Sequence, residues 1–304
     1  MAAAATAATC GSLAAQTGSD RREPLRSRFV YSLNAGTLRG HKLGLVREIE
    51  IAAKAGYQAI EPWVEGIERY AREGGSLGEL RRRIADLGLA VACAIGFPEW
   101  VVDDDARRAR GFERAKREMD LVAQIGGRHF AAPPVGATEE PGLDLHRAAE
   151  RYRALLDAGE SLGVVPLVEL WGFSRNLNRL GACAFVAIES GHPKAGVLAD
   201  VFHLYKGGSD FHGLRLLRGG ALPVFHLNDY PAEPPREQAN DGHRIMPGDG
   251  VAPLNQVLGD LAATGSEIVL SLELFNRDYY AQDPLDVAIL GLAKMTAATE
   301  AALA

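Results

Sequence analysis

The sequence of 304 residues is 47% hydrophobic and 24% charged, which is typical of a folded globular protein. A net charge of −6 gives no general attraction to nucleic-acid phosphates or anionic membranes, so we expect neither partner. Three scattered cysteines without a CxxC pair argue against a disulfide framework and a thiolate metal site, and no apolar run has transmembrane length.

Residues 1–25 are rich in alanine and differ from the rest of the chain. A secretory signal needs a basic segment before its apolar core, whereas Arg21 and Arg22 follow the alanine run. We expect a disordered tail here, with the remnant of an export signal as the alternative. The protein is accordingly expected in the cytoplasm, or exported in the alternative case, with one catalytic domain over residues 26–304.

From residue 28 onwards, short apolar segments alternate with helical patterns. Five of these patterns end at glycine and lead at once into an apolar segment, which is typical of βα repeats. A last helix is expected to begin at the Asp283-Pro284 cap, and two helices near 181–190 and 210–218 are expected from position. The eight predicted strands cover residues 28–36, 59–64, 90–97, 128–135, 165–172, 195–204, 222–229 and 267–276.

Eight βα repeats predict an α/β fold, a single (β/α)8 TIM barrel. A doubly wound sheet is the alternative, but it usually has fewer strands. Its dinucleotide-binding form also needs a glycine-rich turn after the first strand, which residues 34–44 do not match.

The active site of such a barrel lies at the C-terminal ends of the strands. Side chains alternate along a strand, so Leu167 shares a face with Glu169, and Val224 shares one with His226. The ionisable side chains at these ends can therefore point towards the barrel axis. They are Glu61, Glu169, Asp200, His203, His226, Asp229 and Glu273.

Four of these side chains, from four consecutive strands, are expected to converge on one divalent metal ion: Glu169, Asp200, His226 and Glu273. One such side chain alone is more often a loop cap or a surface group, but four at equivalent positions favour a metal site. Three carboxylates and one imidazole suit manganese, which we expect, or magnesium, cobalt or zinc. A structural zinc site would want more cysteine or histidine.

Asp200 and His203 are three residues apart, so a regular strand would point them to opposite faces. We therefore expect the strand to end near Val201 and the chain to turn, with Asp200 on the metal and His203 towards the substrate. Glu61 either contacts substrate or pairs with a nearby arginine or lysine. Four aromatic residues either line a pocket or belong to the core: Trp63, Phe97, Trp171 and Phe275.

The segments VEL, ADVFH, FHLND, PGDG and LSLELFN resemble the xylose-isomerase-like barrel superfamily. That group includes ketose epimerases, inosose isomerase, hydroxypyruvate isomerase and the endonuclease IV group. The resemblance runs from about residue 28 to the end and is strongest from residue 165 onwards. It implies the same four metal ligands, namely Glu169, Asp200, His226 and Glu273.

The resemblance also implies substrate contacts. His203 corresponds to a histidine that contacts a substrate oxygen in the ketose epimerases. These enzymes also use an arginine after the seventh strand, for which we choose Arg236, with Arg244 as the alternative. Arg175 stands where they have an acidic residue, and a more anionic or differently hydroxylated substrate is one explanation. Trp171 completes the expected substrate-binding residues.

The expected chemistry is proton transfer at a carbon next to a carbonyl, with Glu169 and Glu273 as the catalytic carboxylates. We expect an isomerase or epimerase of a small keto-sugar or keto-cyclitol. A lyase or dehydratase, such as a 3-keto-glycoside-cleaving enzyme, would share the first step and is the alternative. A DNA-repair endonuclease is disfavoured because its further histidines on early strands are missing. The partner is then a small carbohydrate, and a homo-oligomer is compatible with this fold.

Overall fold

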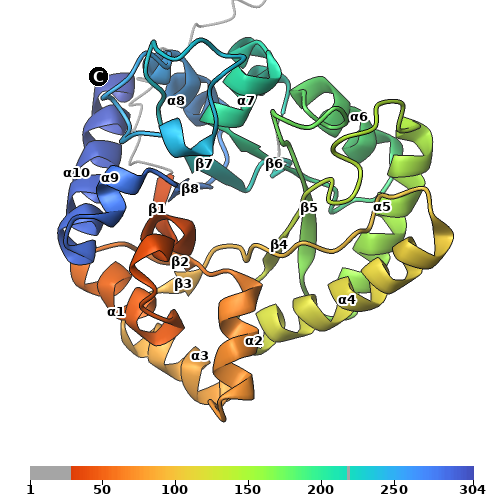
Figure 1. The fold of residues 1–304 in the computed structure, drawn as a ribbon, viewed down its shortest axis with the longest axis horizontal. Coiled ribbons are helices and arrows are strands. Elements are labelled where there is room, and N and C mark those ends of the chain that lie inside the picture. The colour runs from red at the N-terminus through yellow and green to blue at the C-terminus, as the bar shows by residue number, and fades with distance from the viewer. Residues whose placement is uncertain (1–28, 218–219) are drawn as a thin grey trace, which may run out of the picture.

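The computed structural model describes residues 29–217 and 220–304. Their eight parallel strands form one curled sheet surrounded by helices, which confirms the single TIM barrel (Figure 1). The expected tail or signal remnant at residues 1–25 lies outside the described residues. No helix in the described part of the chain is long and apolar enough to cross a membrane.

All eight expected strands are present, and every one is shorter than expected. Each chain segment leaves the sheet soon after it reaches the lip of the barrel, although its apolar sequence continues. The sheet order is β3-β2-β1-β8-β7-β6-β5-β4. The strands are β1 (Phe29–Asn34), β2 (Ala59–Glu61), β3 (Ala90–Val91), β4 (His129–Ala132), β5 (Val165–Glu169), β6 (Val197–Asp200), β7 (Val224–Leu227) and β8 (Ile268–Leu272).

The gap between β3 and β4 is closed by isolated contacts instead of a regular ladder. Ile95 forms bridges with Trp63 on one side and Ala131 on the other. The Ala94 amide also donates to the His129 carbonyl at 3.1 Å, and the Ala131 amide donates to the Ala94 carbonyl at 3.0 Å. These bonds join the two ends of the curled sheet.

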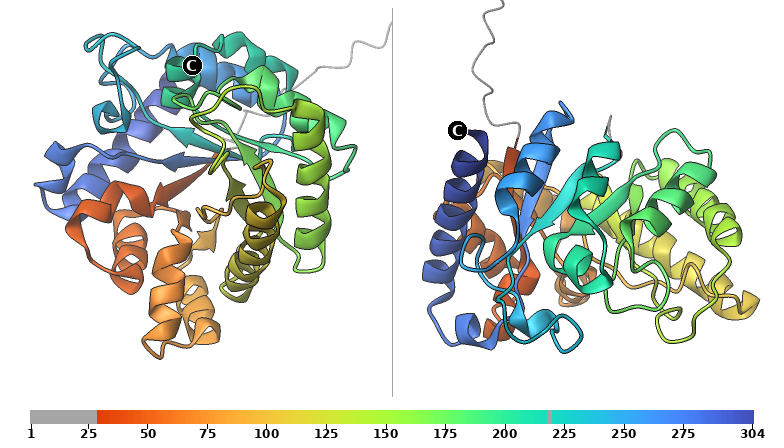
Figure 2. Two further views of the ribbon diagram at one scale, coloured as in Figure 1. Left: turned by 45° about the vertical axis from the view of Figure 1, so that its right-hand side comes forward. Right: turned by 90° about the horizontal axis from the view of Figure 1, so that it is seen from above.

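Seven of the expected helices are present around the sheet, and they lie outside it in both further views (Figure 2). The segment near 210–218 is instead the 3-10 helix η2 (Phe211–Leu216). The seven are α1 (Leu45–Ala55), α3 (Leu77–Asp86), α4 (Asp105–Gln124), α5 (Leu145–Glu160), α6 (Leu180–Glu189), α8 (Leu254–Ala263) and α10 (Pro284–Leu303).

Five further helical segments are not predicted from the sequence. Two of them begin directly after a strand end and two more begin within five residues of one, where the chain must turn back from the lip. They are η1 (Ala35–His41), α2 (Val64–Arg72), α7 (Val201–Gly207), η3 (Asp241–His243) and α9 (Arg277–Tyr280).

The predicted glycine and aspartate signals do end and begin helices in the structure. Gly56 ends α1 in the left-handed region at φ 95, where its amide donates to the carbonyls of Ala52 and Ala53. The Asp283 side chain accepts from the Leu285 and Asp286 amides, which fixes the start of α10. Both ends are therefore determined by local sequence.

An apolar layer fills the barrel interior below the strand ends. It is separate from the larger core between sheet and helices. Leu167, Leu198 and Val224 belong to this inner layer, and the ionisable groups of β5, β6 and β7 follow each of them by two residues. The pleat therefore directs those groups to the same interior, one step nearer the lip. The inner layer consists of Cys93, Ile95, Ala131, Leu167, Leu198 and Val224.

Candidate active site

A pocket of about 360 Å³ opens above the inner layer, and we call it the site pocket. Its location at the C-terminal strand ends is where TIM-barrel enzymes hold their active sites. It brings together Glu169, at the end of β5, and side chains from the segments that follow every strand except β4. Its charged and polar lining residues are Arg39, Glu169, His203, Asp241, Arg244 and Glu273.

The wall of the site pocket is a chain of ring contacts. Trp63 packs edge-on against Phe97 and Phe275, with ring centroids 5.2 and 6.2 Å away. Phe97 lies 6.2 Å from Trp171. On the far side of Trp171, Phe173 continues the wall to His203. The expected aromatic wall is thus part of the pocket and not simply core. The apolar lining residues are Trp63, Ile95, Phe97, Trp171, Phe173 and Phe275.

Asp200, His226 and Glu273 offer three ligand atoms within 4.8 Å of one another, and all three residues are buried. His226 Nδ1 lies 3.1 Å from Glu273 Oε2 and 3.8 Å from Asp200 Oδ2. Within the described residues this nitrogen has no partner of hydrogen-bond geometry. A buried polar atom without a partner is costly, whereas two carboxylates and one imidazole are common ligands of divalent ions. These residues therefore fit the expected metal.

Glu61 lies behind this three-residue group and is not among the residues that line the site pocket. Both of its carboxylate oxygens face His226 Nε2, at 3.0 and 3.2 Å. The Asn34 amide donates to the same carboxylate at 2.9 Å. Glu61 thus pairs with a histidine and not with the arginine or lysine that the sequence left open. With Nε2 donating to Glu61, a bound metal ion would replace the second proton of His226 at Nδ1, beside Asp200 and Glu273, as in carboxylate–histidine–metal arrangements.

Glu61→Gln should lower the affinity for a divalent ion about 10- to 100-fold, because the amide no longer fixes the tautomer of His226. The measurement is calorimetric titration of metal into the chelator-treated protein. Glu68→Gln, an exposed change on the neighbouring helix α2, is the matched control and should bind like the unmodified protein. Equal affinity in both variants would refute the positioning role of Glu61.

The two predicted catalytic carboxyl groups have opposite pKa shifts. Burial raises the pKa of Glu169 to about 8, and the charge of His226 offsets only part of this effect. Burial also opposes ionisation of Glu273, but His226 and Arg244 outweigh it and hold the pKa of Glu273 well below its usual range. In the protein alone at neutral pH, Glu169 is therefore protonated and Glu273 is ionised. Such divergent pairs are typical of acid–base catalysis.

Glu169 lies outside the three-residue group, and its Oε1 accepts from the Trp171 indole nitrogen at 3.0 Å. Its Oε2 has no partner within the described residues. It lines the site pocket together with Glu273. Its assignment as a fourth metal ligand stays a prediction, since the geometry assigns it only to the pocket.

Arg244 is fully buried at the centre of the site, unlike the Arg236 chosen from the sequence. Its Nη1 donates to Asp200 Oδ2 at 2.8 Å and to Glu273 Oε2 at 2.7 Å. Its Nη2 donates to His203 Nε2 at 2.9 Å and to Asp241 Oδ1 at 2.6 Å. The guanidinium charge therefore balances carboxylates that would otherwise repel one another.

The loop after β7 returns to the strand end and so brings Arg244 to the site. Asp229 and Ile245 form an antiparallel bridge, with both amide-to-carbonyl distances at 3.0 Å. The Asp229 carboxylate also accepts from the amides of Gly248, Gly250 and Ala252. A Cβ at position 250 would lie 2.2 Å from the Tyr230 carbonyl oxygen, so only glycine fits this close approach. The PGDG segment thus holds the end of the loop against β7 through its backbone amides.

Asp200 ends β6 and also caps the next element, which is the helix α7 and not the expected turning loop. Its Oδ1 accepts from the His203 amide at 2.8 Å, the usual N-cap bond. The tight start of α7 brings His203 to the pocket wall despite the odd spacing. Burial, together with the charge of Arg244, lowers the pKa of His203, so its imidazole is neutral. Because Nε2 accepts from Arg244, the proton is on Nδ1.

The structure does not bring the other two predicted substrate-binding arginines to the site pocket. Arg175 is exposed in the loop after β5, where its amide donates to the Thr138 carbonyl. Arg236 lies on the outer part of the β7–α8 loop, with its guanidinium 3.4 Å from Glu237. Arg244, the alternative, takes the central position, because the bridge formed by Asp229 brings back only the end of that loop. Of the remaining predicted contacts, Trp171 does line the pocket.

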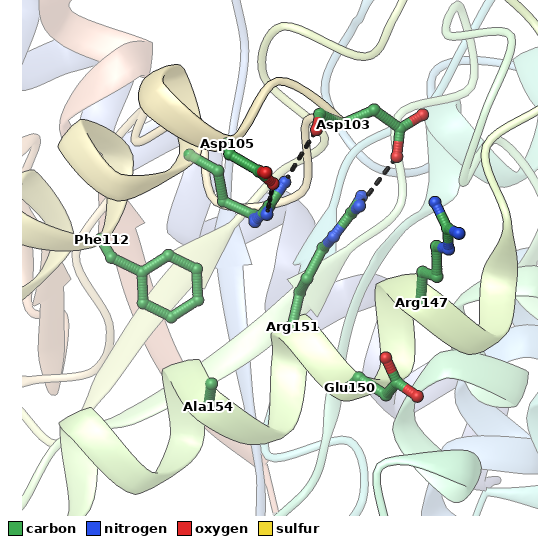
Figure 3. Close-up of a pocket in the computed structure, with 8 residues that line it drawn as sticks. Asp103, Asp105, Phe112, Arg147, Glu150, Arg151 and Ala154 are labelled. Atoms are coloured by element: carbon green, nitrogen blue, oxygen red, sulfur yellow. Dashed lines mark hydrogen bonds and ion pairs between the residues drawn. The ribbon is translucent and has the colours of Figure 1, made fainter.

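A larger hollow of about 530 Å³ lies between α4 and α5 (Figure 3). Arg151 donates to Asp103 at 2.8 Å and to the Val101 carbonyl at 2.6 Å. Arg108 pairs with Asp105. Opposite charges are paired here, and the hollow lies between two helices and not at the C-terminal strand ends.

Residues 49–297 match the family model described as the xylose isomerase-like TIM barrel. This match covers most of the chain, and the chain belongs to that family. The fold and the location of the site pocket agree with this assignment.

Two relatives carry enzyme names. The 3-dehydroshikimate dehydratase of Pseudomonas aeruginosa is 28% identical over 260 residues, which is 82% of this chain and 39% of the relative. The inosose isomerase of Bacillus velezensis is 25% identical over 247 residues, covering 78% of this chain and 85% of the relative. The chain therefore spans about two fifths of the dehydratase and most of the inosose isomerase.

The solved structure of the IOLI protein with a zinc atom superposes with a TM-score of 0.82 at 20% identity. The superposition covers 89% of this chain and 98% of the other. At this identity the likeness shows the fold alone.

Proposed function

We propose that this protein is a divalent-metal-dependent isomerase or epimerase that moves a proton beside the carbonyl of a small keto-sugar or keto-cyclitol. The observation that carries the proposal is that two carboxyl groups, Glu169 and Glu273, line one pocket and have pKa shifts in opposite directions, while Glu273 also belongs to the group of candidate metal ligands. The inosose isomerase relative supports the substrate class.

Asp200, His226 and Glu273 would hold the ion, and manganese or zinc suits two oxygens and one imidazole. Zinc gains support from the IOLI structure, whereas manganese was preferred from the sequence. The bound ion would supply Lewis-acid stabilisation of the charge that develops on the carbonyl oxygen. Glu61 fixes His226, and Arg244 keeps Glu273 ionised.

Glu273 takes the proton from the carbon beside the carbonyl, and the electron pair of the broken C–H bond enters the enediol. Glu169 stands three strands away in the sheet order and gives its proton back to carbon. Protonation of the same carbon from the other face gives an epimer. Protonation of the neighbouring carbon gives an isomer, with the hydroxyl proton of the enediol passing to the former carbonyl oxygen. His203 donates from Nδ1 to a substrate oxygen.

A dehydratase is the second candidate, because the Pseudomonas aeruginosa relative carries that name. Proton removal by Glu273 would be the same, but Glu169 would protonate a departing hydroxyl group and not the carbon. Proton NMR of the products separates the two reactions, since only elimination creates a new carbon–carbon double bond.

The proposal predicts that chelation abolishes exchange of the substrate proton with solvent. The protein would be stripped with EDTA and its metal measured by mass spectrometry. Deuterium uptake from D2O into a panel of keto-sugars and inososes would then be followed by NMR, before and after manganese or zinc is returned. Restored exchange is the expected result. Exchange that persists without metal, or no exchange into any ketone with metal, would contradict the proposal.

A further inference from the structure

Arg39 is a cationic group on the wall of the site pocket that nothing in the described part of the chain neutralises. Its guanidinium carbon lies 4.5 Å from the centre of the Trp63 ring, a cation–π distance. A cation–π contact does not use the N–H groups as hydrogen-bond donors to oxygen. Within residues 29–217 and 220–304, no side-chain hydrogen bond or ion pair of Arg39 is formed.

The segment that carries Arg39 is held firmly, although the side chain itself is exposed. In η1, Thr37 Oγ1 donates to the Leu272 carbonyl at 2.8 Å and accepts from the Leu274 amide at 3.0 Å. The Tyr280 hydroxyl donates to the Gly36 carbonyl at 3.0 Å. The backbone of η1 is thus tied to the segment after β8, so Arg39 is presented to the pocket by a fixed element.

Trp63, on which the guanidinium lies, is fixed as well. Its indole nitrogen donates to Asn34 Oδ1 at 3.2 Å, and Asn34 also donates to Glu61. The same asparagine therefore links the surface beneath Arg39 to the residue that orients His226. A group bound at Arg39 has a defined position relative to the metal ligands.

The other arginine of the pocket cannot take this role. Arg244 is saturated by Asp200, Asp241, Glu273 and His203. Between it and Arg39 lie the rings of Phe275 and Trp63. The volume of about 360 Å³ suits a ring of modest size with one charged substituent.

We propose that Arg39 is a specificity-determining residue that binds a carboxylate on a cyclic keto substrate. The inference rests on the proposed function for the identity of the reacting ketone, but the anion contact is separate from proton transfer. A carboxylate matches the planar fork of one guanidinium, whereas a phosphate usually gathers several donors.

The test uses two matched probes, 3-oxocyclohexane-1-carboxylate and its neutral carboxamide. Binding is followed by quenching of tryptophan fluorescence, since Trp63 and Trp171 line the pocket. The unmodified protein should bind the carboxylate about tenfold more tightly, and Arg39→Gln should remove that preference. Arg39→Lys keeps the positive charge and should keep part of the preference for the carboxylate. Arg82→Gln, an exposed arginine on α3, is the control and should change nothing.

The preference is the readout that decides the inference. A preference that survives in Arg39→Gln, an unmodified protein that binds both probes equally, or one that binds neither would overturn it. Deuterium exchange into the same two ketones is measured in parallel. Exchange without a carboxylate preference refutes the role of Arg39 and leaves the proposed function standing. If the carboxylate preference is lost in Arg39→Gln but no variant exchanges deuterium into either ketone, the role of Arg39 stands and the proposed function is refuted.

Discussion

Glu273→Gln should lower the rate of substrate deuterium exchange by about 100- to 10,000-fold, the usual contribution of a general base. The amide has the same shape but cannot accept a proton at neutral pH. In the unmodified protein His226 and Arg244 hold the pKa of Glu273 low, so its carboxylate is ionised over the working range of pH. Loss of the charge also weakens the metal group, so the exchange rate should be measured at saturating metal.

The matched control for this change lies at the other end of the same strand. Glu267 is exposed just before β8, and Glu267→Gln should exchange at the unmodified rate. Thermal unfolding of both variants shows whether either change disturbs the barrel. Full exchange activity in a folded Glu273→Gln protein would remove Glu273 from the mechanism and leave Glu169 as the remaining candidate base.

Local periodicity accounts for the fold prediction. Apolar strands, glycine-terminated helices and the Asp283-Pro284 cap are local signals, and they placed eight strands and six helices, whereas α6 was expected from its position in the repeat. The strand ends were overestimated because the lip segments remain apolar: Trp63 and Ile95 form bridges there without extending a ladder. The helix α7 did carry a signal, since Asp200 is an N-cap and Gly208 ends it in the left-handed region at φ 73.

The site was predictable where a side chain follows the strand period and not where a loop supplies it. Glu169 and His226 share a face with inner-layer residues, which pattern alone indicates. Arg244 depends on the pairing of Asp229 with Ile245, a contact across a long loop that no local pattern reveals. For the same reason the sequence favoured Arg236. Arg39 is not predicted from the sequence, because a single arginine in a loop is ordinarily a surface charge.

Asp200→Asn should lower metal affinity at least about 100-fold. Replacing a residue that hydrogen-bonds to a metal ligand already lowers affinity by up to about that factor, and replacing a ligand carboxylate should lower it no less. His203→Gln should leave metal affinity nearly unchanged and instead weaken substrate binding or turnover. Its amide oxygen can still accept from Arg244 where Nε2 does, but the Nδ1 donor is gone. Metal titration by calorimetry and steady-state exchange kinetics on both variants separate the two roles.

Two variants of Asp200 are needed because this residue has a second, structural role. Its carboxylate caps α7 and accepts from Arg244 and Asn228. Asparagine keeps the cap but turns an amide towards those donors. Asp200→Ser also keeps a cap acceptor and introduces no such amide, so both variants should lose metal if ligation is the cause. Asp210→Asn is the control, since Asp210 caps η2 on the exposed surface. Metal lost from His203→Gln, or retained by both Asp200 variants, would reverse the assignment.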